Sequence, residues 1–126
     1  MANIVLIDES SANRAVLAAA LRHAGHHILV ADDGDAMLTL SHAPPIDLMI
    51  IDVFDAALDG LATLVRLNGQ YPDLPLVALS QSRQDLESAL EIGGLATLAK
   101  PTSATEAIAT IDMVLRRVRK RAQSAA

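Results

Sequence analysis

Acidic side chains follow two apolar segments of the chain, at the point where each segment ends. Asp8 and Glu9 come directly after the apolar residues 4–7, and Asp52 comes directly after the apolar residues 48–51. A carboxylate at the end of a buried strand is costly unless its charge has a use. If the two segments are neighbouring parallel strands, the three carboxylates meet at one edge of a sheet.

Such a cluster of carboxylates needs compensating positive charge. Two carboxylates about 4 Å apart repel each other by roughly 4 kcal/mol at an effective dielectric constant of about 20. Either one carboxyl group takes up a proton and its pKa rises, or a divalent cation neutralises the cluster. Because the ligands are all oxygen, with no Cys or His among them, we expect Mg²⁺ or Mn²⁺ rather than zinc.

Two further polar side chains end later apolar segments. Ser80 follows residues 76–79, and Lys100 follows residues 95–99. A hydroxyl group and an ammonium group both suit a phosphoryl oxygen. Together with the carboxylates, they predict phosphoryl transfer with an aspartate as the acceptor. Two structural interpretations stay open: Asp52 as a helix cap or surface residue, and Ser80 as the cap of the next helix.

Short apolar strands alternate with amphipathic helices along the chain. Several strands are apolar on both faces, which is typical of a parallel sheet covered by helices on both sides. We therefore predict an α/β domain with one doubly wound five-stranded sheet and five helices. In the strand order 2-1-3-4-5, the switch point lies between the first and third strands, where the three carboxylates lie. The predicted strands are residues 4–7, 28–31, 47–51, 76–79 and 95–99, and the predicted helices are residues 11–24, 34–42, 60–70, 83–92 and 103–121.

The composition indicates a single domain with an aliphatic core. The chain has 126 residues, 52% of them hydrophobic, but only one Tyr, one Phe and no Trp. Stacking of bases on aromatic rings is therefore not expected, and the net charge of -5 argues against general binding of nucleic acid. With no Cys, no disulfide or thiolate chemistry is available. We expect no signal peptide and no membrane span, and therefore a cytoplasmic protein.

Several motifs, taken in order, resemble those of the receiver domain of two-component response regulators, chemotaxis regulators included. They are VLIDE at residues 5–9, ADDGDA at 31–36, DLMIID at 47–52 with LDG at 58–60, PLVALS at 75–80 and AKP at 99–101. The resemblance implies the flavodoxin-like fold. It also implies a receiver domain at residues 1–121, followed by a frayed tail or the start of a linker at residues 122–126.

The resemblance further implies that Asp52 is phosphorylated by a histidine kinase or a histidine phosphotransfer protein. Mg²⁺ would be held by Asp8 through water, by Glu9, by Asp52 and by the backbone carbonyl of Phe54. Ser80 would turn toward the phosphoryl group and Lys100 would pair with it. Such a protein is not an enzyme with an external substrate, because it accepts one phosphoryl group and loses it slowly by its own hydrolysis.

In the family, phosphorylation shifts a two-state equilibrium on one face of the domain. In this chain that face corresponds to residues 83–92, 95–99 and 103–121, which could also form a homodimer. The partner downstream would be a target protein or an output domain outside this sequence. No direct contact with nucleic acid and none with a membrane is expected of this domain.

Three parts of the sequence depart from the usual pattern of the family. Thr97 stands where a Tyr or Phe is common, so the aromatic switch is missing. Gln81 stands directly after Ser80, where a small residue is usual. The stretch Asp55, Ala56, Ala57 replaces Met-Pro-Gly and adds a carboxylate near the site. These departures keep an alternative open, a receiver-like interaction module that acts without phosphorylation.

Two other classes of protein with this architecture do not fit the sequence. A phosphatase of the haloacid dehalogenase type would need Asp at position 54, where Phe54 stands, and a flavodoxin would need a fuller phosphate loop after the first strand.

The histidines and the basic end of the last helix receive structural interpretations. His23, His26 and His27 are assigned no function. The basic residues 116–121 complement the dipole of the last helix, with an acidic partner or nucleic acid as the alternative.

Overall fold

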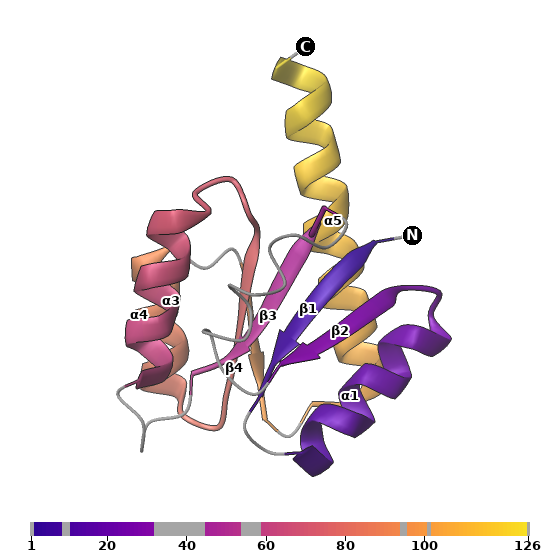
Figure 1. Ribbon diagram of the computed structural model, residues 1–126, viewed down its shortest axis with the longest axis vertical. Helices are drawn as coiled ribbons and strands as arrows, with labels where there is room; N and C mark the ends of the chain where they lie inside the picture. The colour runs from indigo at the N-terminus through magenta and orange to yellow at the C-terminus, as the bar shows by residue number, and fades with distance from the viewer. Residues whose placement is uncertain are drawn as a thin grey trace.

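The five strands form one parallel sheet in the order β2-β1-β3-β4-β5 (Figure 1). The structure is a computed structural model that describes residues 2–8, 11–31, 45–53, 59–93, 96–100 and 102–125. The strands are β1 (Asn3–Ile7), β2 (His27–Ala31), β3 (Leu48–Asp52), β4 (Leu76–Ser80) and β5 (Ala96–Ala99). The described helices are α1 (Ser11–His23), α3 (Asp59–Gln70), α4 (Arg83–Ile92) and α5 (Ala104–Ala125). The predicted sheet and its order are confirmed.

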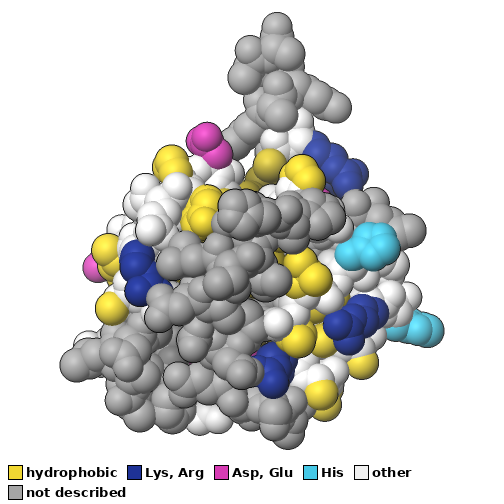
Figure 2. Space-filling model, in the orientation of Figure 1, with side chains coloured by type: hydrophobic (Ala, Val, Ile, Leu, Met, Phe, Trp, Pro, Cys, Tyr) yellow, Lys and Arg dark blue, Asp and Glu magenta, His cyan; other side chains and the backbone are white. Residues whose placement is uncertain are grey.

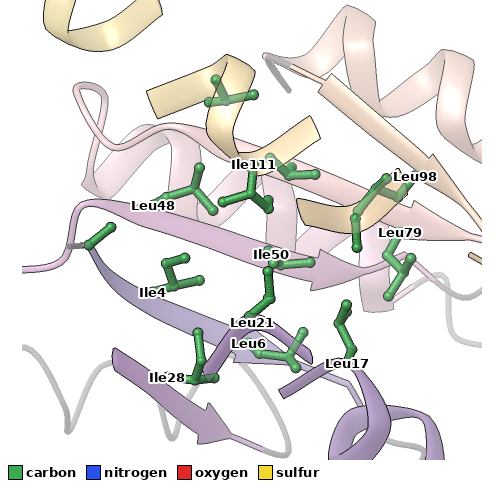
Figure 3. Close-up of a cluster of buried hydrophobic side chains, with 14 of the residues drawn as sticks. Ile4, Leu6, Leu17, Leu21, Ile28, Leu48, Ile50, Leu79, Leu98 and Ile111 are labelled. Atoms are coloured by element: carbon green, nitrogen blue, oxygen red, sulfur yellow. The ribbon is translucent and has the colours of Figure 1, made fainter. Parts of the chain in front are cut away.

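Side chains of the central strands alternate between two core layers, one on each face of the sheet. Ile4 and Leu6 of β1 belong to the layer under α1 and α5, which also takes Leu21 of α1 and Ile111 of α5 (Figure 3). Val5 and Ile7, which point the other way, belong to the layer under α3 and α4. Because both faces of β1 are covered, its sequence does not alternate between apolar and polar residues, as expected for a strand of a parallel sheet.

Helices α1 and α5 cover one face of the sheet and helices α3 and α4 cover the other (Figure 1). In such an arrangement, side chains at the carboxyl ends of the strands can meet at one edge of the sheet. In the part of the chain that the structure describes, no helix has both the length and the apolar composition to cross a membrane.

Helix α4 begins at a cap formed by Ser82. The Ser82 side chain accepts a hydrogen bond from the backbone N–H of Asp85 at 3.3 Å, while its own backbone is extended. The interpretation of Ser80 as the cap of this helix is therefore wrong. Gly93 ends the helix with φ +139°, a backbone conformation in which residues other than glycine are strained.

Predicted and observed boundaries differ at a few places. The predicted helix at residues 34–42 lies outside the described residues, so four of the five predicted helices are described. Strand β3 includes Asp52, and strand β4 includes Ser80. Helix α5 continues to Ala125, beyond the predicted end at residue 121, and projects past the sheet (Figure 1). Residues 122–125 are helical, and the division of the chain at residue 121 stays a prediction.

Candidate functional site

The register of the sheet brings four of the predicted site residues to one edge. Ile7 pairs with Ile51, so Asp8, which follows β1, and Asp52, the last residue of β3, lie at the same level on neighbouring strands. On the other side of β3, Asp52 pairs with Leu79, one residue before Ser80. The backbone N–H of Lys100 donates to the carbonyl oxygen of Ser80 at 2.8 Å, which fixes the end of β5 beside that of β4.

Lys100 joins the two aspartates. Its Nζ lies 2.7 Å from Oδ2 of Asp52 and 3.2 Å from Oδ2 of Asp8. The exposed fractions of these side chains are 10% for Lys100, 8% for Asp52 and 0% for Asp8, so the three charges interact with little screening by water. The sequence placed all three residues at this edge, but it did not show that one ammonium group binds both carboxylates.

The two carboxylates outnumber the one ammonium group, and the pKa values respond to this imbalance. Burial raises the pKa of Asp52 above its ordinary value; Lys100 acts in the opposite direction, and the nearby charge of Asp8 adds to the rise. Although burial acts to lower the pKa of Lys100, the hydrogen bond and charge of Asp52, followed by those of Asp8, raise it overall. The pKa of Asp52 therefore rises mainly through burial, whereas the pKa of Lys100 rises through its two carboxylate partners.

One carboxylate oxygen of Asp52 makes no hydrogen bond within the part of the chain that the structure describes. Oδ1 is buried and, among the described residues, has no hydrogen-bond partner. A buried charged oxygen without a partner is costly, so this atom is suited to a ligand. The oxygen-only surroundings fit Mg²⁺ or Mn²⁺ better than a softer metal.

The predicted metal ligands are described only in part. Asp8 and Asp52 come together, whereas Glu9 and Phe54 lie outside the described residues. Within the ranges that the structure describes, no group of three or more His, Cys, Asp or Glu residues is gathered as a metal would need. The complete ligand set therefore stays a prediction.

Ser80 is buried, with 2% of its surface exposed. Its Oγ accepts a hydrogen bond from the backbone N–H of Ser82 at 3.0 Å. The hydroxyl group thus contacts the connection into α4, and Ser82 in turn caps that helix. A rotation of the Ser80 side chain toward Asp52 would break the first of these bonds.

Arg14 is a site residue that the sequence analysis missed. Its Nη1 donates to the backbone carbonyl oxygen of Asp8 at 3.0 Å. Its position in the first residues of a predicted helix could have indicated this role. A positive charge at the start of a helix opposes the helix dipole, so an arginine there indicates a contact outside the helix.

A pocket of about 220 Å³ lies beside Lys100, between α1 and the start of α5. Val16 and Leu17 of α1 form part of its apolar wall, and Gln81 and Thr102 contribute polar atoms. Gln81, the unusual residue after Ser80, is exposed and lines this pocket together with Lys100.

Three other features named in the sequence analysis were Thr97, the histidines and the stretch at residues 55–57. Thr97 is half-buried in β5 and pairs with Ala78. His26 accepts a hydrogen bond from the backbone N–H of Ala2 at 3.3 Å, and its other ring nitrogen lies 3.4 Å from Asp112. The stretch at residues 55–57 lies outside the described residues.

Figure 2 shows the surface in the orientation of Figure 1. Where side chains are described on this face, those of Lys and Arg lie at separate places among hydrophobic and uncharged ones. The visible described surface thus carries no single broad basic area of the kind that general binding of nucleic acid uses.

Comparisons with known proteins identify the family of the chain. The sequence model of the response regulator receiver domain matches residues 4–112. The response regulator GtcR of Aneurinibacillus migulanus is 33% identical over 116 residues, which are 90% of this chain and 48% of that protein. The probable transcriptional regulator ycf27 of Guillardia theta is 32% identical over 123 residues, 96% of this chain and 48% of that protein. The chain thus spans about half the length of these curated relatives.

Solved structures give the same result. The receiver domain of NtrX from Brucella abortus has a TM-score of 0.81 at 29% identity, covering 90% of this chain and 98% of that one. A longer NtrX chain, crystallised with ADP, has a TM-score of 0.91 at 26% identity and covers 98% of this chain and 29% of that one. The chain belongs to the response regulator receiver domain family, whose members serve phosphorylation-based two-component signalling.

Proposed function

We propose that Asp52 accepts a phosphoryl group from a phosphohistidine on a histidine kinase or a histidine phosphotransfer protein. One observation carries the proposal. Asp52 has one oxygen bound to Lys100 at 2.7 Å and a second oxygen that is buried and, among the described residues, without a partner. The first contact orients the carboxylate, and the second oxygen is left to react.

In the proposed transfer, Oδ1 of Asp52 forms a bond to phosphorus while the bond between phosphorus and the donor imidazole nitrogen breaks. The electron pair of the broken bond stays on the imidazole, which takes up a proton. Lys100 then lies close enough to pair with an oxygen of the phosphoryl group. Its raised pKa keeps it protonated for this role.

The buried charges of the site fit a bound divalent cation. Asp8, Asp52, Glu9 and the carbonyl of Phe54 would hold it, and Mg²⁺ would supply positive charge that offsets the negative charge of the transferred group. Asp8 is kept in place by Lys100 at 3.2 Å and by Arg14 through its carbonyl. These contacts prepare the acidic edge before any cation arrives.

Ser80 would receive another oxygen of the phosphoryl group. To do so its hydroxyl must leave the backbone N–H of Ser82, with which it now bonds at 3.0 Å. Exchange of one hydrogen bond for a charge-assisted one favours the phosphorylated arrangement by about 1 kcal/mol. The energy difference between the two states of a switch is of this order or a few kcal/mol.

The proposed transfer needs two kinds of partner, a phosphodonor and a protein that responds to phosphorylation. A phosphodonor protein would supply the phosphohistidine, and a target protein or an output domain outside this sequence would respond to the change at α4, β5 and α5. A homodimer through the same three elements stays a prediction, and so does the cytoplasmic location. Thr97 gives β5 no aromatic ring to move, so the response would depend on α4 and its cap.

The proposal is tested by incubating the protein with Mg²⁺ and acetyl phosphate. We expect one acid-stable, base-labile phosphoryl group per chain, which Asp52→Asn abolishes. Asp47→Asn is the matched control, because Asp47 precedes the same strand and its carboxylate bonds the backbone N–H of Asn3 at the opposite edge of the sheet. If the folded wild type is not labelled at any Mg²⁺ concentration, the proposal fails in favour of an interaction module without phosphorylation.

A further inference from the structure

The backbone carbonyl of Asp8 needs a partner that the sheet does not give it. Strand β1 pairs with β2 and β3 on its two sides, and both ladders end at Ile7. Asp8 is the first residue beyond them and is 1% exposed. A buried carbonyl at such a place must find another donor. The guanidinium group of Arg14 provides it at 3.0 Å.

The position of Arg14 is unfavourable for helix α1 alone. Arg14 is the fourth residue of α1, which has no acidic residue in its first turn. A positive charge at the start of a helix opposes the helix dipole. Arg22, in the last turn of the same helix, has the favourable position and donates to the carbonyl of Ile28 at 2.9 Å. The contact of Arg14 with the acidic edge compensates for its unfavourable place.

Arg14 of α1 thus contacts the backbone directly after β1, at the residue whose carboxylate lies 3.2 Å from Lys100. We infer that Arg14 is a positioning residue for the cation site. Its bond to the backbone of Asp8 holds the Asp8 carboxylate in the orientation that cation binding needs. The inference rests on the proposed function, because it assigns a task to Arg14 in the binding of the divalent cation.

Two effects of Arg14 on a bound cation have opposite signs. Its charge repels a cation, so loss of the charge alone would tighten binding. Its hydrogen bond orders the backbone of Asp8, so loss of the bond would weaken binding. Groups that orient the ligands of a metal typically change its affinity by roughly 10- to 100-fold when removed. A half-buried guanidinium group acts on a cation through partly screened charge. We therefore expect positioning to dominate.

The test measures Mn²⁺ binding to the unphosphorylated full chain through the electron paramagnetic resonance signal of free Mn²⁺. Arg14→Gln should raise the Kd roughly tenfold. Arg22→Gln is the matched control: it also removes one charge and one bond from an α1 arginine to a backbone carbonyl, but at the other end of the helix. Its Kd should stay within about twofold of the wild type. An equal effect of the two variants, or tighter binding by Arg14→Gln, overturns the inference.

A second measurement separates positioning from general damage to the fold. In labelling with acetyl phosphate, Arg14→Gln should raise the Mg²⁺ concentration that gives half the maximal rate and leave the rate at saturating Mg²⁺ unchanged. A lower saturated rate with an unchanged half-saturation point overturns the inference. If Arg14→Gln does not fold, Arg14→Lys decides, because it keeps the charge without the planar donor pair. A Kd raised at least about threefold supports positioning, and a smaller change overturns it.

The outcomes also distinguish this inference from the proposed function. If the wild type binds no Mn²⁺, the proposed cation site fails, and the role of Arg14 fails with it. If the wild type binds Mn²⁺ and all variants bind it equally, the role of Arg14 alone fails.

Discussion

Replacement of Lys100 by Met should destabilise the protein strongly, because it leaves two buried carboxylates without their shared partner. The two Oδ2 atoms lie 3.2 and 2.7 Å from the same Nζ, so they are at most about 5.9 Å apart. At that separation and an effective dielectric constant of about 20, they repel by about 3 kcal/mol. Removal of one partner of a buried ion pair costs about 3–5 kcal/mol in other proteins. We take about 3 kcal/mol, because uptake of a proton relieves part of the repulsion.

This loss converts to a change of melting temperature. The entropy of unfolding is about 2.1 cal/mol/K per residue, or about 0.26 kcal/mol/K for this chain of 126 residues. A loss of about 3 kcal/mol therefore lowers the Tm by about 11 °C. Calorimetry at pH 7 without divalent cations measures it. Lys120→Met is the matched control, because Lys120 is the only other lysine and is exposed on α5; its Tm should stay close to that of the wild type.

The pH dependence checks the same reasoning. The pKa of Lys100 is raised above its ordinary value of 10.5 in the folded state, so the folded state holds this proton more tightly than the unfolded state. Its stabilising effect is complete below 10.5 and is lost as the pH rises through the folded-state pKa. The difference between the wild type and Lys100→Met should shrink in that range. If Lys100→Met melts within about 3 °C of Lys120→Met at pH 7, Lys100 does not hold the two carboxylates as described.

Three further predictions concern stability. Because the folded-state pKa of Asp52 is raised from 3.8, the stability of the wild type falls relative to Asp52→Asn as the pH rises through that pKa; the variant should be the more stable at pH 7 without divalent cations, and a calorimetric Tm series with the opposite slope would contradict this. Ser82→Ala should lose about 1 kcal/mol in urea unfolding, because α4 loses its cap, and no loss would refute that role. Gly93→Ala should lose about 1–3 kcal/mol, because φ is +139° and a Cβ would lie 2.8 Å from Nδ2 of Asn68; Gly69→Ala, with open space around it, should be neutral or stabilising by up to about 1 kcal/mol, and equal losses would show that the backbone of Gly93 is not the cause.

Much of the fold could be predicted because local sequence and global topology agree in this chain. The strands are apolar on both faces, which only a sheet covered on both sides explains. Asp52 and Ser80 end such strands, and Asp8 and Lys100 directly follow them, so the parallel order of the strands brings all four to one edge. The position of these residues therefore followed from counting along the chain.

The contacts made by those residues could not be predicted in the same way. The choice of Ser82 over Ser80 as the cap of α4 depends on where the helical dihedral angles begin, and both residues are serines within two positions. The bond from Arg14 to the carbonyl of Asp8 depends on how α1 is placed relative to the end of β1. Periodicity carries no information on such placements, whereas it predicts strands and helices well.

The length of α5 was underestimated for a related reason. The predicted end at residue 121 coincides with the end of the basic run at residues 116–121. The observed helix continues to Ala125, through residues rich in alanine, which has the highest helix propensity. The basic run thus does not mark the last turn of the helix, because local helix propensity continues beyond it.

The most direct test of the central proposal is to locate the phosphoryl group. After incubation with Mg²⁺ and acetyl phosphate, the acyl phosphate is reduced with borohydride, which converts the modified aspartate to homoserine, and the peptides are mapped by mass spectrometry. We predict homoserine at position 52 and at no other aspartate. Homoserine at another position, or none in a folded protein that binds Mg²⁺, would contradict the role of Asp52 as the phosphoacceptor.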